Sequence, residues 1–183
     1  MAGIGEQSLR WFAAARVEAE PDVTALVGEY SGLLYRVALS VLRNAAEAED
    51  VVQDAFVRVL QQKELSGVRE MRPWLVRIVW NLALDRRRRV PVDQMDEAFA
   101  AALVDRNLPA DDRLQEMQRM RAVLREMERL PAGERDVLRL SAMEELATAE
   151  IAKVLGRSES SVRSLLFRAR TRLRERLEKG DRA

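Results

Sequence analysis

The chain of 183 residues contains no cysteine and no histidine. The absence of cysteine excludes disulfide bonds and thiol nucleophiles, and the absence of both residue types excludes the common zinc sites. Without histidine, the chain lacks the usual general base near neutral pH, so an enzyme would have to work with carboxylates and lysines. The composition therefore argues against an enzyme, and we expect no metal site and no cofactor.

Long hydrophobic runs are also missing. No segment approaches the run of roughly 18 apolar residues that identifies a membrane-spanning helix. The N-terminal segment 1–22 carries acids and has no long apolar core, unlike a secretory signal peptide. Since 48% of the chain is hydrophobic and 33% is charged, it can bury a core. We expect a cytoplasmic protein that does not insert into a membrane.

The net charge is only +1, but the charges are segregated along the chain. Residues 69–89 contain seven arginines and two acids, and residues 157–182 contain nine basic residues and four acids. Between these segments, residues 90–112 contain six acids and one arginine. Two basic regions therefore flank an acidic one, which is bracketed by Pro91 and Pro109 and has the character of a linker.

Apolar residues recur at helical spacing through most of the chain, and there are only eight glycines. The spacing predicts helices over 26–42, 46–62, 73–88, 112–130, 134–140, 148–155 and 159–178. We expect an all-α protein with two small helical domains joined by a flexible acidic linker. The expected divisions are an N-terminal extension (1–20), a first domain (21–90), the linker (91–112) and a second domain (113–183).

Residues 148–178 have the pattern of a helix-turn-helix, because a short helix, a turn at Gly156 and a longer helix follow one another. On a helical wheel the apolar members of the longer helix share one arc: Val162, Leu165, Leu166, Ala169, Leu173 and Leu177. Phe167 lies on the opposite side with small polar residues, where a phenylalanine is unusual. The second helix of such a motif enters the major groove of DNA. The alternative is a solvated amphipathic helix, whose arginines pair with Glu159, Glu175 and Glu178.

Residues 74–84 form a helix with two apolar stripes, which indicates a helix packed on both sides. We therefore expect Trp80, and largely Trp74, to pack in a core. Residues 46–60 form another amphipathic helix, with Glu49, Gln53 and Asp54 on its exposed face. Acids at positions 47, 49, 50 and 54 are the densest carboxylate cluster, but they lack further groups at metal-ligand spacing, which favours a solvated face.

Three blocks carry a resemblance to a known family: "AEAEDVVQDAFVRVL" (46–60), "WLVRIVWNLALDRRRR" (74–89) and the helix-turn-helix region 130–177. In this order they resemble an extracytoplasmic-function sigma factor of bacterial RNA polymerase. The resemblance implies that core RNA polymerase, promoter DNA and an anti-sigma factor are partners. A transcriptional regulator that binds duplex DNA without polymerase explains only the third block.

The resemblance also implies three sets of site residues. Residues expected to dock on polymerase are Glu49, Asp50, Gln53 and Asp54. Residues expected to bind and melt the −10 element are Arg72, Trp74, Arg77, Asn81, Arg86, Arg87 and Arg88. Residues expected to read the −35 duplex are Arg157, Ser160, Arg163, Ser164, Phe167, Arg168 and Arg172. The chain departs from the family at Trp80, where a small or basic residue is usual, and at Ala147, where a capping serine is common. Thr148 is expected to cap its helix instead.

Overall fold

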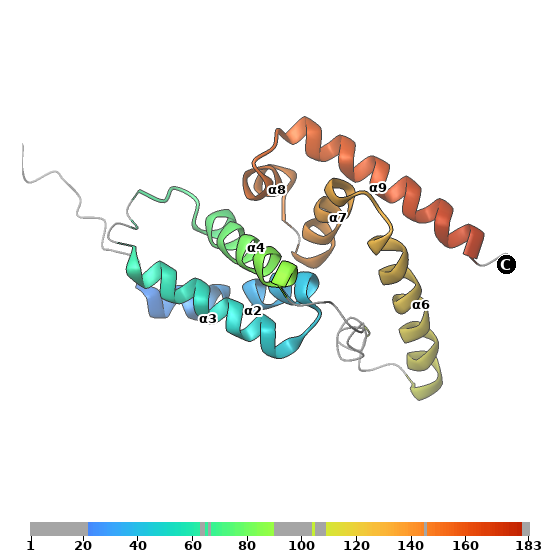
Figure 1. Ribbon diagram of the computed structural model, residues 1–183, viewed down its shortest axis with the longest axis horizontal. Coiled ribbons are helices and arrows are strands. Elements are labelled where there is room, and N and C mark those ends of the chain that lie inside the picture. Colours follow the sequence, from blue (N-terminus) through green and yellow to red (C-terminus); the bar gives the residue numbers. More distant parts are fainter. Residues whose placement is uncertain are drawn as a thin grey trace, which may run out of the picture.

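The computed structural model of the chain describes residues 22–62, 65, 67–89, 104, 109–144 and 146–180. Helices make up nearly all of these residues, and no strand occurs among them (Figure 1). The helices are α2 (Val23–Leu42), α3 (Ala45–Gln61), α4 (Met71–Arg89), α6 (Ala110–Glu128), α7 (Ala132–Glu144), α8 (Thr148–Leu155) and α9 (Glu159–Gly180). The predicted all-α fold is confirmed. The predicted N-terminal extension and most of the predicted linker lie outside the described residues.

Helices α2, α3 and α4 pack against one another and are called the first helix group. Each contributes one apolar stripe to a shared core, as shown by the complete burial of Val37, Ala55 and Val79. By length and composition, α2 passes a test for membrane-crossing helices, but half of its most apolar window is buried inside the protein. The packing therefore identifies α2 as the core helix of this group.

Helix α2 begins at Val23 and helix α3 at Ala45, one to three residues before the predicted starts, because polar side chains cap them. Asp22 accepts a hydrogen bond from the backbone N–H of Thr24 at 2.9 Å, and Asn44 accepts one from the backbone N–H of Glu47 at 3.0 Å. Between the two helices, Arg43 takes a left-handed conformation with φ of 58°. Apolar spacing predicts the body of each helix, whereas the caps set its start.

Helices α6 to α9 form the second helix group. Helix α9 packs on α7, α8 and α6, and its predicted apolar stripe is buried at Val162, Leu165 and Ala169. Gly156 ends α8 in the left-handed region with φ of 63°, which glycine adopts without a steric penalty. Helices α8 and α9 with this turn are the predicted helix-turn-helix.

Two local expectations differ from the structure. Thr148 is the first residue of α8 rather than its cap, since Ala147 takes the N-cap position and its N–H donates to the Glu150 carboxylate at 2.9 Å. That hydrogen bond is one half of a capping box. The helix start is therefore stabilised by Glu150, a residue within the helix, and not by a cap at Thr148. Helix α6 begins at Ala110, inside the predicted linker, because Asp111 and Asp112 in the first turn suit the positive end of a helix.

The two helix groups lie against each other. Helix α4 packs on α8, and α2 packs on α7 (Figure 1). Trp80 of α4 is only 2% exposed and shares a cavity of about 260 Å³ with Gly133, Val154 and Leu155 of the second group. This contact explains the two apolar stripes of α4, because one stripe meets its own group and the other faces the second group. The prediction that Trp80 packs in a core is confirmed.

Candidate nucleic-acid interface

The outer face of α9 is open to solvent and combines hydroxyl, guanidinium and aromatic groups. An open depression is lined by Ser160, Arg163, Ser164, Phe167 and Arg168. Phe167 is 73% exposed although it is a large apolar residue. The ring stands among hydroxyl and guanidinium groups, a combination that offers apolar contact, hydrogen bonds and positive charge to a partner. The structure brings these five predicted residues together, with Arg157 exposed just upstream.

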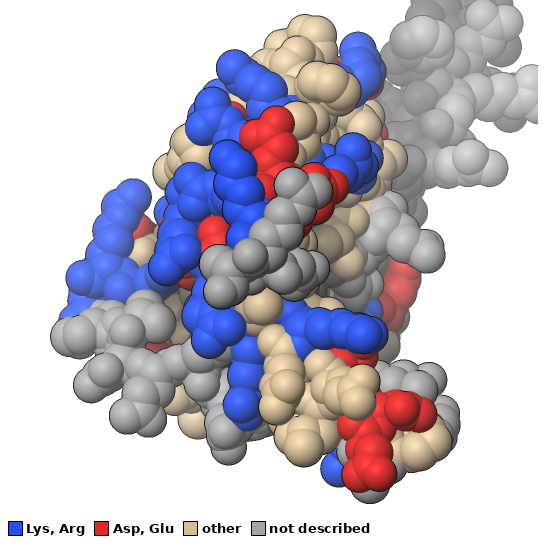
Figure 2. Space-filling view, turned by 90° about the vertical axis from the view of Figure 1, so that its right-hand side faces the viewer, with Lys and Arg blue, Asp and Glu red and all other residues tan. Residues whose placement is uncertain are grey.

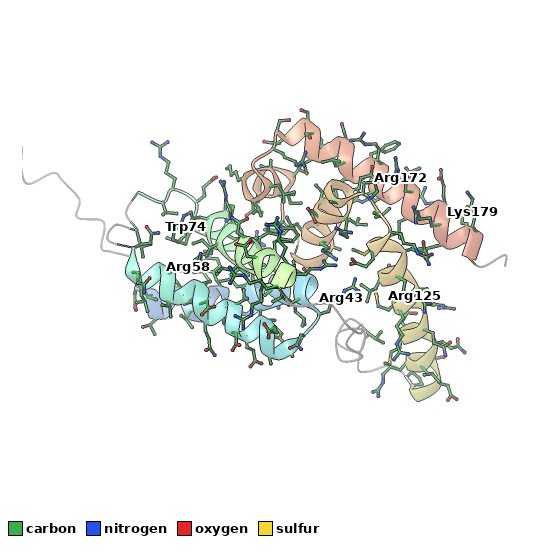
Figure 3. The ribbon with its side chains drawn as sticks, in the orientation of Figure 1. Arg43, Arg58, Trp74, Arg125, Arg172 and Lys179 are labelled. Carbon is green, nitrogen blue, oxygen red and sulfur yellow. The ribbon has the colours of Figure 1, made fainter. Side chains whose placement is uncertain are left out.

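Carboxylates of α7 and α6 contact a row of arginines along one edge of α9. The Nε atoms of Arg168 and Arg172 lie 4.0 and 3.4 Å from the carboxylate of Glu134, whose side chain is 5% exposed. One turn further, Arg176 lies 3.5 Å from Glu126. These contacts hold the guanidinium groups along one edge of α9, the helix on which Figure 3 labels Arg172. The sequence analysis missed Glu134, because a helical wheel of α9 does not show which acid of α7 lies beneath it.

Basic side chains are crowded on the side of the molecule that carries α6 and the end of α9. Figure 2 shows lysines and arginines over much of this side, with fewer acids between them. Such a surface attracts a polyanion and loses affinity as the salt concentration rises. The structure therefore supports nucleic-acid binding over the alternative in which the arginines of α9 are fully paired within their own helix. Of the predicted intrahelical pairs, Arg163 to Glu159 forms at 3.3 Å.

The first half of α4 presents the side chains predicted to bind the −10 element to the second helix group. Arg72 donates to the carboxylate of Glu150 on α8 at 3.1 Å. Trp74 and Arg77 line a cavity of about 390 Å³ together with Lys153 of α8. Arg77 also lines the smaller cavity beside Trp80, with Asn81 and Arg157. The side chains of this half therefore lie beside α8, where Arg77 and Asn81 are still exposed to solvent.

The arginines at the end of α4 do not form one patch. Arg86 pairs with Glu47 and Asp50 of α3, and hydrogen bonding to Glu47 raises its pKa above the ordinary value. Arg87 turns toward the second group and pairs with Glu128 at 2.8 Å. Arg88 is 78% exposed and lies 3.5 Å from Asp85. Three consecutive arginines thus point to three different surroundings, because successive helical residues are about 100° apart.

Glu128, at the end of α6, contacts arginines of both helix groups, as its ion pairs with Arg43, Arg87, Arg135 and Arg139 show. Arg139 is 2% exposed, and burial lowers its pKa to about 10. Burial alone would raise the pKa of Glu128, but the charges of the arginines outweigh burial and leave that pKa below its ordinary value. The sequence analysis did not predict this cluster.

The exposed face of α3 matches its prediction. Glu49, Asp50, Gln53 and Asp54 are all exposed, and the inward residues of the same helix are buried. Two apolar side chains continue this face toward the end of the helix, since Val57 is 49% and Leu60 is 64% exposed. In the part of the chain that the structure describes, no group of acids has the arrangement of a metal site. The face combines acids, an amide and apolar groups, which suits a protein partner.

Comparison with known proteins gives two family matches, sigma-70 region 2 over residues 26–90 and sigma-70 region 4 over residues 120–173. The extracytoplasmic-function sigma factor SigL of Mycobacterium tuberculosis is 32% identical over 169 residues, which cover 84% of this chain and 88% of SigL. SigW of Bacillus subtilis is 28% identical and covers 83% of the chain. The probable sigma factor RfaY of Xanthomonas campestris is 35% identical over 147 residues, and the match spans only 36% of RfaY.

Two solved structures share the fold. CnrH, in complex with the cytosolic domain of CnrY, is 26% identical, with a TM-score of 0.62 over 86% of this chain and 88% of CnrH. The sigma factor RpoE of Bartonella quintana, in complex with the anti-sigma factor NepR, has the same TM-score of 0.62 at 19% identity, over 85% of this chain and 96% of RpoE. The second likeness concerns the fold alone.

Proposed function

Since the chain belongs to the extracytoplasmic-function sigma factors, we propose that it binds core RNA polymerase and directs promoter recognition and transcription initiation, with a separate task for each exposed helix face. The first domain, residues 21–90, docks on polymerase and acts at the −10 element. The second domain, residues 113–183, reads the −35 element. The observation that carries this proposal is the open outer face of α9, where Phe167 stands among hydroxyl and guanidinium groups.

At the −35 element, the N-terminal half of α9 enters the major groove of duplex DNA. Arg163 and Arg168 are able to contact guanine edges or neighbouring phosphates, and Phe167 suits the methyl group of a thymine. Ser160 and Ser164 line the same surface, and Arg157 is exposed just before the helix. Arg172, held by Glu134 at 3.4 Å, lies farther along the helix, where it meets the phosphate backbone.

At the −10 element, α4 holds the strand that is separated from its partner. Arg72, Arg77 and Asn81 supply charge and hydrogen bonds on one side of the helix, with Trp74 half-buried beside them as a stacking surface for a base. Arg86, Arg87 and Arg88 bring positive charge to the end of the same helix. Family members of this kind are initiation factors rather than enzymes, and these groups act by binding and positioning DNA.

The exposed face of α3 docks on polymerase. Its acids steer a basic partner, and the Gln53 amide fixes the register, because an amide both donates and accepts hydrogen bonds. The neighbouring exposed Val57 and Leu60 give the interface an apolar part. The protein acts in the cytoplasm, where polymerase is, and an anti-sigma factor regulates it, the kind of partner with which the structurally similar RpoE of Bartonella quintana forms a complex.

The docking face provides the test of the proposed function. The double variant Gln53→Ala, Asp54→Arg should stay folded, since changes at exposed positions usually cost within about 0.5 kcal/mol. It should lose both the capture of purified core polymerase and promoter-specific transcription. The matched control is Gln115→Ala, Asp112→Arg, which makes the same two changes at exposed positions of α6. Normal capture of polymerase by the folded Gln53 and Asp54 variant would contradict the docking assignment.

The same preparation separates the proposed function from a regulator that binds DNA without polymerase. A regulator of that kind would bind promoter duplex alone and would not require the α3 face. The sigma factor should show promoter-specific binding only together with core polymerase. Duplex binding of unchanged strength in the docking variant, without any dependence on polymerase, would favour the regulator.

A further inference from the structure

Glu134, at the start of α7, is an acid buried beneath one edge of α9. Its side chain is 5% exposed and lies close to the guanidinium groups of Arg168 and Arg172. We propose that Glu134 is a positioning residue for DNA specificity, which orients Arg168 toward one base pair of the −35 element and limits sequence-independent binding of phosphates by Arg168 and Arg172. The inference rests on the proposed reading of the −35 duplex by α9.

The start of α7 provides a place for a buried carboxylate. Glu134 lies in the first turn of α7, where the positive end of the helix favours an anion. Its backbone N–H donates to the carbonyl oxygen of Pro131 at 2.9 Å, which fixes the backbone of this turn. The turn also lies close to α9, since a Cβ atom at Gly133 would stand 3.6 Å from Leu165. The backbone of α7 therefore places the carboxylate against α9.

The hydrogen bonding of this carboxylate is incomplete. Its Oε2 atom is buried and accepts no hydrogen bond from any residue that the structure describes, although the Nε atom of Arg172 lies 3.4 Å away. The Nε atom of Arg168 lies 4.0 Å from the other carboxylate oxygen. A buried oxygen without a hydrogen bond is uncommon and costs stability. Packing alone therefore does not explain a charged residue here, whereas the orientation of two arginines does.

Arg168 and Arg172 contact Glu134 on one side and remain open to DNA on the other. Their side chains are 57% and 50% exposed, and Arg168 lines the depression on the outer face of α9 together with Phe167. A guanidinium group has five N–H donors, so Arg168 is able to face Glu134 through Nε and a guanine edge through its terminal nitrogens. The contact with Glu134 restricts the rotamers of Arg168 before DNA binds, which lowers the entropy lost on binding.

The charge of Glu134 also opposes the binding of phosphates. A phosphate near Arg172 is attracted by the guanidinium group and repelled by the carboxylate behind it. Phosphate contacts supply nearly all of the sequence-independent affinity for DNA, whereas base contacts supply the preference for a sequence. Glu134 therefore lowers the affinity for random DNA while it supports the base contact of Arg168.

The promoter preference of Glu134→Gln tests the positioning role, because glutamine has nearly the shape of glutamate without its charge. Transcription of a library randomised at the −35 element, with core polymerase and the full-length chain, measures the preference. Arg168→Ala identifies the base pair that Arg168 reads. Glu134→Gln should lower the preference there about fivefold, the low end of what a good base contact contributes. The control Glu29→Gln removes the same charge at an exposed position of α2 and should leave the preference unchanged.

A double-mutant cycle shows whether Glu134 acts through Arg168. In the Arg168→Ala background, Glu134→Gln should cause no further loss of preference at that base pair, because the side chain that it positions is gone. An equal loss in both backgrounds would overturn the positioning role. A normal preference in the folded Glu134→Gln variant, or in Arg168→Ala, would overturn it as well.

Binding to duplex DNA without a −35 element tests the role of the charge. Fluorescence anisotropy of a labelled duplex, titrated with the full-length chain at several salt concentrations, measures this affinity. Glu134→Gln should bind about fivefold more tightly at low salt, as expected when one competing ion pair is lost. The slope of log affinity against log salt should become steeper by up to about one unit. A purely structural role predicts weaker binding, so weaker or unchanged binding by the folded variant would overturn the role of the charge.

Glu134→Asp replaces Glu134→Gln in both measurements if circular dichroism shows that the glutamine variant does not fold. Aspartate keeps the negative charge at the helix start, but its side chain is one methylene shorter, so its carboxylate lies farther from Arg168. It should keep the wild-type salt slope and lose preference at the base pair of Arg168. A normal preference in Glu134→Asp would then overturn the positioning role.

Failure of this inference and failure of the proposed function give different results. If the wild-type chain with core polymerase shows no preference at the −35 element, the proposed function fails. If the wild type shows the preference and the folded Glu134 variant keeps it, the proposed function stands and the positioning role of Glu134 is wrong.

Discussion

Helices α4 and α9 both carry arginines and an aromatic side chain near their proposed DNA contacts, but Trp80 of α4 is 2% exposed and Phe167 of α9 is 73% exposed. Helix α4 packs on its own group and on α8, although Arg77 and Asn81 stay exposed. Helix α9 packs through one stripe and leaves its outer face free. An aromatic side chain is therefore part of the core in α4, whereas in α9 it is exposed to solvent.

The difference suits the two kinds of DNA proposed for these helices. A duplex presents its major groove without being opened, so a permanently exposed face such as that of α9 reads it directly. Unpaired bases appear only when the duplex opens, and a basic, aromatic surface that binds them would otherwise bind other single strands without sequence preference. Of the two tryptophans of α4, Trp80 is buried, and only the half-buried Trp74 is left to stack on a base.

Truncation of the two aromatic side chains should give the largest difference in stability between changes in α4 and in α9. Trp80→Ala should lower the free energy of unfolding by about 3 to 5 kcal/mol, since it empties a buried site. Phe167→Ala should change it by less than about 0.5 kcal/mol, because the ring packs little. Urea titration followed by circular dichroism measures both. A small loss for Trp80→Ala would mean that the second side of α4 is open in solution, and the contrast between the helices would disappear.

Promoter preference should depend on the exposed Phe167, whose truncation has the smaller effect on stability. Phe167→Ala should change the preference at one or two positions of the −35 element by about 1 to 3 kcal/mol per base pair. Transcription of a randomised promoter library with core polymerase measures this change, and we expect the lost preference to be for thymine. An unchanged preference with normal activity would show that the exposed ring does not contact a base.

Arg88 tests whether an exposed arginine of α4 acts in promoter opening. It is 78% exposed and pairs with Asp85 of its own helix instead of the second group. Arg88→Gln should slow promoter opening by roughly fivefold, about 1 kcal/mol for one charged contact. The defect should be smaller on a template with a pre-melted −10 region. Arg36→Gln, at an exposed position of α2, is the control. Equal defects on both templates would assign Arg88 to general affinity instead of melting.

Arg172 should have the smallest effect, because it is proposed to touch only phosphate. Arg172→Ala should weaken binding evenly across promoter sequences and lower the slope of log affinity against log salt by about one unit. Titration of holoenzyme with −35 duplexes at several salt concentrations measures the slope. A change of preference at a single base pair would instead place Arg172 in contact with a base.

Much of the fold could be predicted from the sequence because helical periodicity is a local property. The stripe of Val162, Leu165 and Ala169 and the exposed Gln53 and Asp54 follow from positions within one helix. Helix ends were less predictable, since caps such as Asp22 and the Glu150 contact to Ala147 lie outside the apolar pattern. The expected cap at Thr148 was wrong for this reason.

The sequence by itself determined which side chains of each helix point to a core and which point to solvent, because about 3.6 residues make one turn wherever the helix lies. Tertiary structure alone decided what stands opposite each face. It joined Arg43 and Arg87 to Glu128, set Glu134 beneath the arginines of α9, and placed α8 over α4. These contacts connect residues far apart in the chain, and a helical wheel holds no information about neighbouring helices, so the contacts between the two helix groups became visible only in the folded molecule.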